Sequence, residues 1–386
     1  MRIAMYWHNG RSLGHTAESA KVAHGLVDSG EEMHISGLTG AWRGLDLLPA
    51  GMDVVKLPAF TNYDNASGWG TTGRTAMAAG PLFRLRSELS EVFLRHYAPD
   101  VFLVNHLPRG AEDELVPALT ATRGAGERRV LTLRGVLFDA EKTDREYFSE
   151  DSARWIDRHF DAIHVHTHPE VFRLEDHYGV PHYLRDRIHY TGYLVDEFQL
   201  GRDAARASLG VDDAERLVLA SMGGGQGAMG LWTALIDALA EQRTGFDRVR
   251  LVTGPYLEAA DARTLRARAA ELPWLEVVAY EPAMMTWMAA ADLFIGAAGA
   301  NMLSEVLAVG CNSIVIPRQV RESEQRIHAR LLADRGLVRM CDLPDVLAGA
   351  IGPTLAEALR EPLAPKAGHL LGGARRYAAL LRGEGA

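Results

Sequence analysis

Short apolar runs alternate with longer stretches of helical period along the whole chain. In the first half, the runs that predict β-strands are residues 3–7, 54–57, 101–105, 130–133, 162–166 and 188–191. In the second half they are residues 217–221, 249–253, 275–279, 293–295 and 313–316. Segments with helical spacing lie between them, including 17–27, 83–96 and 153–158. Because strands that alternate with helices form βαβ units, the pattern predicts two parallel sheets covered by helices.

The polar segment 195–204 has no clear period and separates the two series of strands. We therefore expect one domain at residues 1–197 and a second at residues 205–363. The segment 364–386 has a helical apolar spacing and is expected to pack back on the first domain. The predicted fold class is α/β, with two doubly wound Rossmann-like domains facing a central cleft. Ligands of such domains bind outside the carboxyl ends of the strands.

Composition narrows the class of protein. Of the 386 residues, 47% are hydrophobic and 24% are charged, which is ordinary for a globular protein of about two domains. The formal charge of −9 argues against a general nucleic-acid binder. Cys311 and Cys341 are too few for a disulfide framework or a cysteine-type zinc site. No apolar run reaches the roughly 18–20 residues of a membrane span, so a cytoplasmic protein is expected.

The segment 299–325 carries the most specific chemistry. The strand before it ends in small residues that allow close backbone approach, and a helix is predicted to begin there. The unpaired N–H groups and positive dipole end of such a helix suit a diphosphate. Glu305 lies about one turn into this helix, within reach of a ribose diol. The residues expected around the diphosphate are Gly299, Ala300 and Asn301, and Glu324 and Gln325 open the next helix, where they suit sugar hydroxyls.

A glycine-rich turn at 222–228 follows the strand 217–221 and precedes a helix. Successive glycines let backbone N–H groups converge on phosphate oxygens. The turn lacks the Lys-Ser/Thr ending of a P-loop, and the next strand ends without the acidic residue of a nicotinamide site, so neither ATP nor NAD chemistry is expected. A plain glycine-rich turn is the alternative. The residues concerned are Gly223, Gly224, Gly225 and Gln226.

Two further positions are candidates for the same ligand. Tyr280 ends the strand 275–279, where its ring would pack on a nucleotide base, although an ordinary core aromatic fits the sequence nearly as well. Arg318 and Arg321 follow the strand 313–316 and would add positive charge near the phosphates. A solvated helix start is the alternative for both arginines.

His15 follows Gly14 at the opening of the first predicted helix. An imidazole titrates near pH 6.5 and suits a general base, whereas a helix cap is the structural alternative. Asn105, His106 and Arg134 lie at the ends of the strands 101–105 and 130–133 and are candidates for contacts to a second substrate. The polar, glycine-rich stretch 62–75 is expected to be a long loop near the cleft.

Three histidines alternate along and just beyond the strand 162–166, which places them on one face of the sheet. No carboxylate lies nearby in the sequence at an obvious ligand spacing. We therefore expect no metal site at His164, His166 and His168.

These elements resemble the GT-B nucleotide-sugar glycosyltransferases, in particular the branch that includes the N-acetylglucosaminyltransferase MurG. The phosphate loop Gly-Gly-x-Gln-Gly-Ala of that family matches 223–228, and its ribose-binding Glu matches Glu305. Its sugar-reading Gln-Gln pair falls on Glu324 and Gln325, so the first position differs. A MurG-like group of predicted glycosyltransferases is more similar still, with signatures at 107–110, 190–193, 252–255 and 317–325. In that group Asp is frequent where this chain has Asn105, and Thr is common where it has Met302.

The resemblance implies an inverting, metal-independent transfer of a hexose or N-acetylhexosamine from a UDP-sugar, without a resident cofactor. The first domain would hold the acceptor and the second the donor, with His15 as base or substrate positioner. The acidic charge and the few lysines favour a small-molecule acceptor, as in specialised-metabolite or antibiotic biosynthesis, over a lipid-linked one. A UDP-sugar epimerase or hydrolase and a non-catalytic nucleotide-sugar binding subunit are the alternatives. The base of the nucleotide, UDP against dTDP or GDP, stays open.

Overall fold

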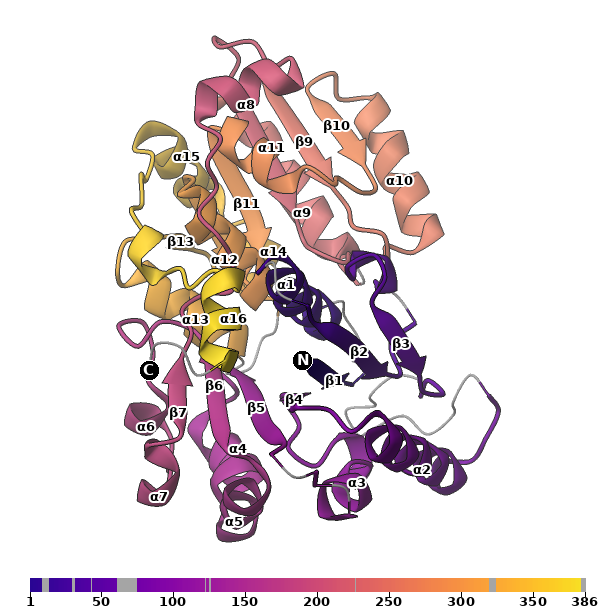
Figure 1. Ribbon diagram of the computed structural model, residues 1–386. Helices are drawn as coiled ribbons and strands as arrows, with labels where there is room; N and C mark the ends of the chain where they lie inside the picture. Colours follow the sequence, from indigo (N-terminus) through magenta and orange to yellow (C-terminus); the bar gives the residue numbers. More distant parts are fainter. Residues whose placement is uncertain are drawn as a thin grey trace. The chain divides into compact units, whose positions relative to one another are not determined.

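The computed structural model describes residues 1–8, 14–29, 32–42, 44–60, 75–121, 123–124, 126–225, 227–318 and 324–382. The chain divides into two compact units (Figure 1). The first contains Met1–Leu194 together with the C-terminal segment Gly372–Ala386, and the second contains Val195–Leu371. Nearly all of the expected loop 62–75 lies outside the described residues, as do 10–13, Gln226 and Arg321.

The first unit is built on a seven-stranded parallel sheet in the order β3-β2-β1-β4-β5-β6-β7. The chain runs outward from β1 to β3 and then returns to place β4 beside β1. This reversal is the switch point of a doubly wound sheet, where ligands commonly bind. The strands are β1 (Arg2–Trp7), β2 (His34–Thr39), β3 (Asp53–Lys56), β4 (Val101–Asn105), β5 (Arg128–Arg134), β6 (Ala162–His166) and β7 (Ile188–Tyr190).

One strand of this sheet was missing from the sequence prediction. β2 has the sequence His-Ile-Ser-Gly-Leu-Thr, which contains no apolar run, yet it pairs with β1 along its full length. Gly37 in its centre lies against Trp7 of β1, where an added Cβ would be 2.6 Å from the indole ring. The glycine in β2 therefore makes room for the bulky Trp7 side chain of the neighbouring strand. The sequence of β2 alone does not reveal this contact.

Helices cover both faces of the first sheet, and α1 and α16 pack together. Tyr377 and Leu381 of α16 join Trp7 and Leu26 in one buried core cluster. Arg128 also donates to the Leu381 carbonyl at 2.9 Å. The helices are α1 (Gly14–Asp28), α2 (Ala79–Tyr97), α3 (Val116–Ala121), α4 (Ala140–Thr143), α5 (Glu150–His159), α6 (Leu174–His177), α7 (His182–Arg185) and α16 (Ala374–Arg382), with short 3-10 turns at Leu45–Leu47 and Ala111–Asp113 and a π-helical turn at Asp144–Phe148.

The second unit has a six-stranded parallel sheet in the order β10-β9-β8-β11-β12-β13. Its core joins Trp232 and Leu235 to Leu251, Ile295 and Ile314. The edge strand β13 was not predicted because two residues are too short for an apolar run. The strands are β8 (Leu217–Ser221), β9 (Arg248–Val252), β10 (Leu275–Val278), β11 (Leu293–Ala297), β12 (Ser313–Ile316) and β13 (Arg339–Met340).

The helices of the second unit connect these strands in the βαβ manner. Among the described residues, no helix has both the length and the apolar character that crossing a membrane requires. The helices are α8 (Arg202–Leu209), α9 (Met229–Glu241), α10 (Ala259–Ala270), α11 (Met284–Ala290), α12 (Ala300–Val309), α13 (Glu324–Ala333), α14 (Leu343–Leu347) and α15 (Gly352–Arg360), with 3-10 turns at Arg243–Gly245 and Gly368–Leu370.

Candidate active site

Three imidazoles gather at the carboxyl ends of β1 and β4 in the first unit. His8 directly follows β1, His15 is the second residue of α1, and His106 directly follows β4. The ring centroids of His8 and His15 are 4.1 Å apart, and those of His15 and His106 are 5.2 Å apart. His106 has φ 68°, a left-handed conformation that is uncommon for residues other than glycine and is often found at functional sites. The fold thus brings two predicted residues, His15 and His106, to one place and adds His8.

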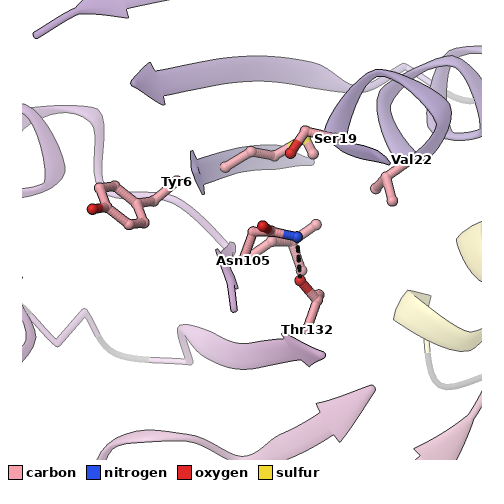
Figure 2. A pocket seen from close by; sticks show the side chains of 7 residues that line it. Tyr6, Ser19, Val22, Asn105 and Thr132 are labelled. Atoms are coloured by element: carbon pink, nitrogen blue, oxygen red, sulfur yellow. Dashed lines mark hydrogen bonds between the residues drawn. The ribbon is translucent and has the colours of Figure 1, made fainter. Parts of the chain in front are cut away.

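Asn105 holds the ring of His15 in one orientation. Its side-chain Oδ1 lies 2.7 Å from Nδ1 of His15. The Asn105 amide Nδ2 donates to Oγ1 of Thr132 at 3.3 Å (Figure 2). The Thr132 hydroxyl donates its own proton to the Val104 carbonyl at 3.4 Å, so it accepts from the Asn105 amide nitrogen and the amide oxygen faces the imidazole. Because an amide oxygen only accepts, Nδ1 must carry the proton, and Nε2 of a neutral His15 then holds the free lone pair. This is the tautomer that a general base needs.

The cavity behind Asn105 is too small for a substrate. It has a volume of about 10 Å³, room for roughly one water molecule. Figure 2 shows Asn105 and Thr132 on one side of it and Tyr6, Ser19 and Val22 on the other. The space therefore belongs to the support of Asn105 and is not an acceptor pocket.

The surroundings keep all three imidazoles neutral. Burial lowers the pKa of His15 well below its usual range, and the neighbouring His8, Arg134 and His106 lower it further. The hydrogen bond from Asn105 acts in the opposite direction. Burial lowers the pKa of His8 to about 3 and that of His106 well below its usual range. His15 is therefore in its basic form at neutral pH.

Glu18 supports this cluster and was not predicted from the sequence. It lies one turn after His15 on α1, and its carboxylate contacts Nε of Arg134 at 3.4 Å and Nε2 of His166 at 3.6 Å. Arg134, the last residue of β5 and an expected contact to the acceptor, is thus held by the buried carboxylate of Glu18. The spacing of three residues between His15 and Glu18 could have indicated Glu18, because residues three apart lie on the same face of a helix.

The alternating histidines have structural roles in the described part of the chain. His164 is fully buried, and its Nδ1 lies 3.3 Å from the hydroxyl of Tyr377. His166 packs edge-on against the Tyr377 ring and contacts Glu18, a carboxylate far from it in the sequence. No three His, Cys, Asp or Glu side chains among the described residues are arranged to hold a metal ion.

A buried ion pair anchors the chain that follows His106. Arg86 of α2 forms a two-point contact with Glu114, with Nη2 to Oε1 at 2.7 Å. The Tyr6 hydroxyl donates to the same carboxylate at 2.5 Å and accepts from the amide of Ala111 at 3.0 Å. Removing one partner of such a pair typically costs about 3–5 kcal/mol because the other charge stays buried. The network fixes the segment between β4 and α3 relative to the sheet.

The glycine-rich turn of the second unit packs backbone against backbone. Gly225 has φ 83°, and a Cβ there would lie 2.0 Å from the carbonyl oxygen of Thr253. A Cβ on Gly254 would lie 2.1 Å from the carbonyl oxygen of Gly223, so both glycines are required by the packing of these two turns. A Cβ on Gly224 would press on the ring of Tyr256 at 3.0 Å. Gly223 has φ 65°, with open space around its own Cβ position.

The predicted helix N-terminus after β11 is present. Gly299 is the N-cap of α12, and no side chain among the described residues caps it. The amide of Leu303 makes the first helical bond, to the Gly299 carbonyl at 2.9 Å. Asn301 and Glu305 lie on this helix and are partly exposed. Met302 packs instead over Gly296 of β11, so the position where Thr is common serves packing in this chain.

Arg318 and Gln325 meet at the end of β12. The backbone N–H of Arg318 donates to Oε1 of Gln325 at 2.9 Å. Nη1 of Arg318 donates to the carbonyl of Met222, just before the glycine-rich turn, at 3.4 Å. Burial lowers the pKa of the Arg318 guanidinium. Glu324, the residue expected beside Gln325 at the sugar, is the first residue of α13.

Tyr280 is no core residue, because 60% of it is exposed. The chain around it is fixed by Glu281, which contacts Arg250 at 2.7 Å and accepts from the amide of Ala283 at 3.0 Å. The carboxyl ends of β8, β9 and β10 thus present the glycine-rich turn, Tyr256 and Tyr280 in order along one sheet edge.

Tyr256 was not predicted from the sequence. Its ring lies against Gly224 of the glycine-rich turn, and this contact makes it a further candidate.

Comparisons with known proteins agree with this architecture. Residues 218–369 match the glycosyltransferase family 28 C-terminal domain. The chain is 32% identical over 160 residues to a UDP-N-acetylglucosamine–N-acetylmuramyl-(pentapeptide) pyrophosphoryl-undecaprenol N-acetylglucosamine transferase of Clavibacter sepedonicus, covering 40% of this chain and 41% of that one. The crystal structure of Acinetobacter baumannii MurG aligns with a TM-score of 0.64 at 16% identity, over 99% of both chains. The glycosyltransferase VinC in complex with dTDP aligns with a TM-score of 0.64 at 14% identity, over 99% of this chain and 98% of that one.

The two parallel α/β units have the GT-B fold. The second unit carries the match to the family 28 C-terminal domain, and the chain is similar to the Clavibacter transferase over 40% of its length. The matched region spans less than half the length of the Clavibacter relative. The donor, the acceptor and the reaction of this chain are therefore matters for a proposal.

Proposed function

We propose that the protein is an inverting, metal-independent glycosyltransferase that moves a hexose or N-acetylhexosamine from a UDP-sugar to a small-molecule acceptor. The observation that carries the proposal is the second unit, a family 28 domain whose glycine-rich turn and α12 N-terminus lie at the carboxyl ends of neighbouring strands. Both features present backbone amides, which suit a diphosphate. Glu305, on the same helix, is proposed to hold the ribose.

The first unit supplies the base in this proposal. Nε2 of the neutral His15 takes the proton of the acceptor hydroxyl while the acceptor oxygen forms a bond to the anomeric carbon. The bond from that carbon to the diphosphate oxygen breaks, and its electron pair leaves with the nucleoside diphosphate. Attack from the face opposite the leaving group inverts the anomeric centre. Donors fixed in advance around the diphosphate stabilise its growing charge without a divalent metal.

The acceptor is the least constrained part of the proposal. The acidic balance of the chain favours a small molecule in the cytoplasm, as in antibiotic or other specialised-metabolite biosynthesis. A lipid-linked acceptor is the second candidate, because the Clavibacter relative is named for a pyrophosphoryl-undecaprenol substrate. Transfer into an organic-extractable lipid fraction, against transfer into a water-soluble product, separates the two.

The decisive experiment is calorimetric binding of UDP, dTDP, GDP and NAD to the purified protein in the presence of a chelator. We expect tight binding of one nucleoside diphosphate, UDP first, and none of NAD. Binding of no nucleoside diphosphate would sink the proposal. Binding that depends on added divalent metal would reject its metal-independent part.

Two rivals predict different products from a UDP-sugar. An epimerase or hydrolase of the same architecture releases UDP or an altered sugar without any acceptor. A non-catalytic binding subunit binds UDP tightly and turns nothing over. Incubation of the protein with UDP-sugar alone, followed by chromatography of nucleotide and sugar, distinguishes an epimerase or hydrolase from a transferase that waits for its acceptor. The same incubation with candidate acceptors distinguishes the binding subunit, because only the transferase then releases UDP.

A further inference from the structure

Two residues that are adjacent in the chain reach the same imidazole in the first unit. Asn105, the last residue of β4, contacts Nδ1 of His15, and the ring of His106 lies 5.2 Å from the His15 ring. Successive side chains of a strand point to opposite faces of the sheet, so a strand that continued through His106 would turn its ring away. At His106 φ is instead 68°, and the amide of Leu107 donates to the Asn105 carbonyl at 2.8 Å. This γ-turn, a strained conformation, brings both side chains to His15.

The strain continues along the segment that follows. Gly110, Glu112 and Asp113 also have positive φ, at 74°, 51° and 59°. Of the five non-glycine residues with positive φ in the described ranges, three lie within residues 106–113. A side chain in this region of backbone space costs free energy and persists only where the surrounding structure holds it. Their concentration here indicates that groups outside the segment fix its conformation.

The ring of His106 depends on this backbone for its position. Its buried Nδ1 has no hydrogen-bond partner among the described residues. The rings of Phe138 and Tyr147 lie 6.2 and 5.8 Å from it, centroid to centroid, and these are packing contacts. A change in the backbone of residues 106–113 would therefore move the ring, because no side-chain hydrogen bond at Nδ1 opposes it.

Three buried side chains hold the far end of this segment. The Tyr6 hydroxyl, in β1, accepts from the amide of Ala111 at 3.0 Å and donates to the carboxylate of Glu114 at 2.5 Å. Arg86 of α2 makes a two-point contact with the same carboxylate, and its Nη1 donates to the Pro58 carbonyl at 2.5 Å. All three side chains are at most 2% exposed. These side chains, the anchor network, tie the segment to β1, to α2 and to the chain after β3.

We propose that the anchor network positions His106 for the reaction: it keeps the segment 106–113 strained and so holds the His106 ring against His15. This contact helps to bury the imidazole that takes the proton of the acceptor. The members of the network act through the segment and are positioning residues. The inference rests on the proposed function for its catalytic meaning, whereas the position of His106 is measurable without any substrate.

Tyr6→Phe is the variant that tests the anchor network, because it removes the hydroxyl that binds Ala111 and leaves the buried ion pair in place. The imidazole signals are followed by NMR against pH without substrate, and the His106 signal is assigned by its loss in His106→Ala. In the wild type His106 should stay neutral well below pH 6.5, because burial lowers its pKa. In Tyr6→Phe the segment relaxes, the ring reaches water and its pKa should rise towards 6.5. An unchanged His106 titration in the folded variant would overturn the proposal.

Tyr97→Phe is the matched control. Tyr97 lies on α2 in the same unit, and its hydroxyl donates to the His34 carbonyl at 2.6 Å. The variant therefore loses a hydroxyl that ties a helix to the same sheet, but one outside the anchor network. His106 should titrate as in the wild type. An equal rise of the His106 pKa in both variants would mean that general loosening of the unit moves the ring, and would overturn the role of Tyr6.

The strain at His106 gives a second, independent test. Glycine is less stable than alanine at an ordinary helix position, so His24→Gly on α1 should have a lower Tm than His24→Ala. At φ 68° the order should reverse, because glycine adopts this φ without strain. His106→Gly should therefore melt at or above the Tm of His106→Ala, although both lack the imidazole. A lower Tm for glycine at both positions would show that His106 carries no strain and would overturn the proposal.

Binding and transfer assays separate this inference from the proposed function. In Tyr6→Phe, calorimetric UDP affinity should stay within twofold, while kcat/KM for UDP release with candidate acceptors should fall about fivefold or more. Tyr6→Phe should have little further effect in the His106→Ala background, because the network acts through that ring. A Tyr6→Phe protein with a displaced His106 and normal transfer would overturn the positioning role. A wild type that binds no nucleoside diphosphate overturns the proposed function and leaves the NMR and Tm results standing.

Discussion

In the first unit the polar groups at the strand ends are titratable side chains, whereas in the second unit most of them are backbone amides. His8, His15 and His106 change charge with pH, and their buried surroundings set where that happens. The glycine-rich turn and the α12 N-terminus do not titrate, and the geometry of the turn depends on Gly225, which has no room for a Cβ. We therefore expect pH and side-chain chemistry to act through the first unit, and backbone shape to act through the second.

The largest expected effect is that of His15→Ala. Loss of a general base typically costs about 100-fold or more in turnover, while the proposed diphosphate site in the other unit is untouched. UDP affinity should therefore stay within twofold in calorimetry as the transfer rate collapses. His24→Ala, on an exposed position of the same helix, is the control and should transfer at the wild-type rate. Near-normal turnover in His15→Ala would give this histidine a structural role.

Gly225→Ala tests the backbone side of the comparison. The new Cβ would meet the Thr253 carbonyl at 2.0 Å and require an unfavourable φ of 83°, so the turn must move. We expect UDP affinity to fall by at least tenfold in calorimetry. Gly210→Ala is the control, because Gly210 has φ 66° with open space around its Cβ position. This variant therefore carries the strain of a positive φ without a steric clash. Equal UDP affinity in both variants would make the turn an ordinary one.

Glu305→Ala should have a smaller effect, confined to the nucleotide. Removing the acceptor of ribose hydrogen bonds costs about 1–3 kcal/mol, or roughly five- to 150-fold in affinity. Glu241→Ala, at the end of α9, removes a carboxylate from an exposed position of the same unit as a control. The measurement is UDP affinity against that of its 2′,3′-dideoxy analogue, and only UDP should weaken. An equal change for both nucleotides would remove Glu305 from the ribose.

The smallest expected effect is a shift of the pH profile in Asn105→Asp. The carboxylate would stabilise the charged His15 imidazole and raise its pKa. Because the base must be neutral, the acid limb of kcat/KM should move to higher pH, whereas the wild-type limb lies well below pH 6.5. Thr132→Val, which loosens Asn105 without adding charge, is the control. A pH profile that does not move in Asn105→Asp would mean that the protonation state of His15 does not control kcat/KM.

The strands and the candidate sites were predictable to different degrees. Apolar runs are a local property, so most strands could be found from the sequence. β2 could not, because it contains no apolar run and only the fold shows that its Gly37 packs against Trp7. Strand ends also marked His15, Asn105, His106 and Arg318, since parallel strands bring their carboxyl ends to one edge.

The supporting residues were mostly beyond reach of the sequence. Glu18 and His166 meet across 148 positions of chain, and no local pattern records that contact. Arg86 did carry a signal, because it shares a four-residue spacing with Leu82, Ser90 and Leu94, all of them buried. A charge within such a stripe indicates a buried partner, but only the fold shows that the partner is Glu114.

The placement of α16 has a consequence for the order in which the two units fold during synthesis. The first unit lacks this helix until residues 372–382 are synthesised, because Tyr377 and Leu381 complete a core that includes Ile3 and Met5. Gly372 connects this segment closely to the end of the first sheet. Its amide donates to the Tyr193 carbonyl at 2.9 Å, and there is no room for a Cβ beside Thr191. The second unit is continuous in sequence. During translation the second unit should therefore reach its native state first, while the first unit, which carries His15, waits for residues 372–382.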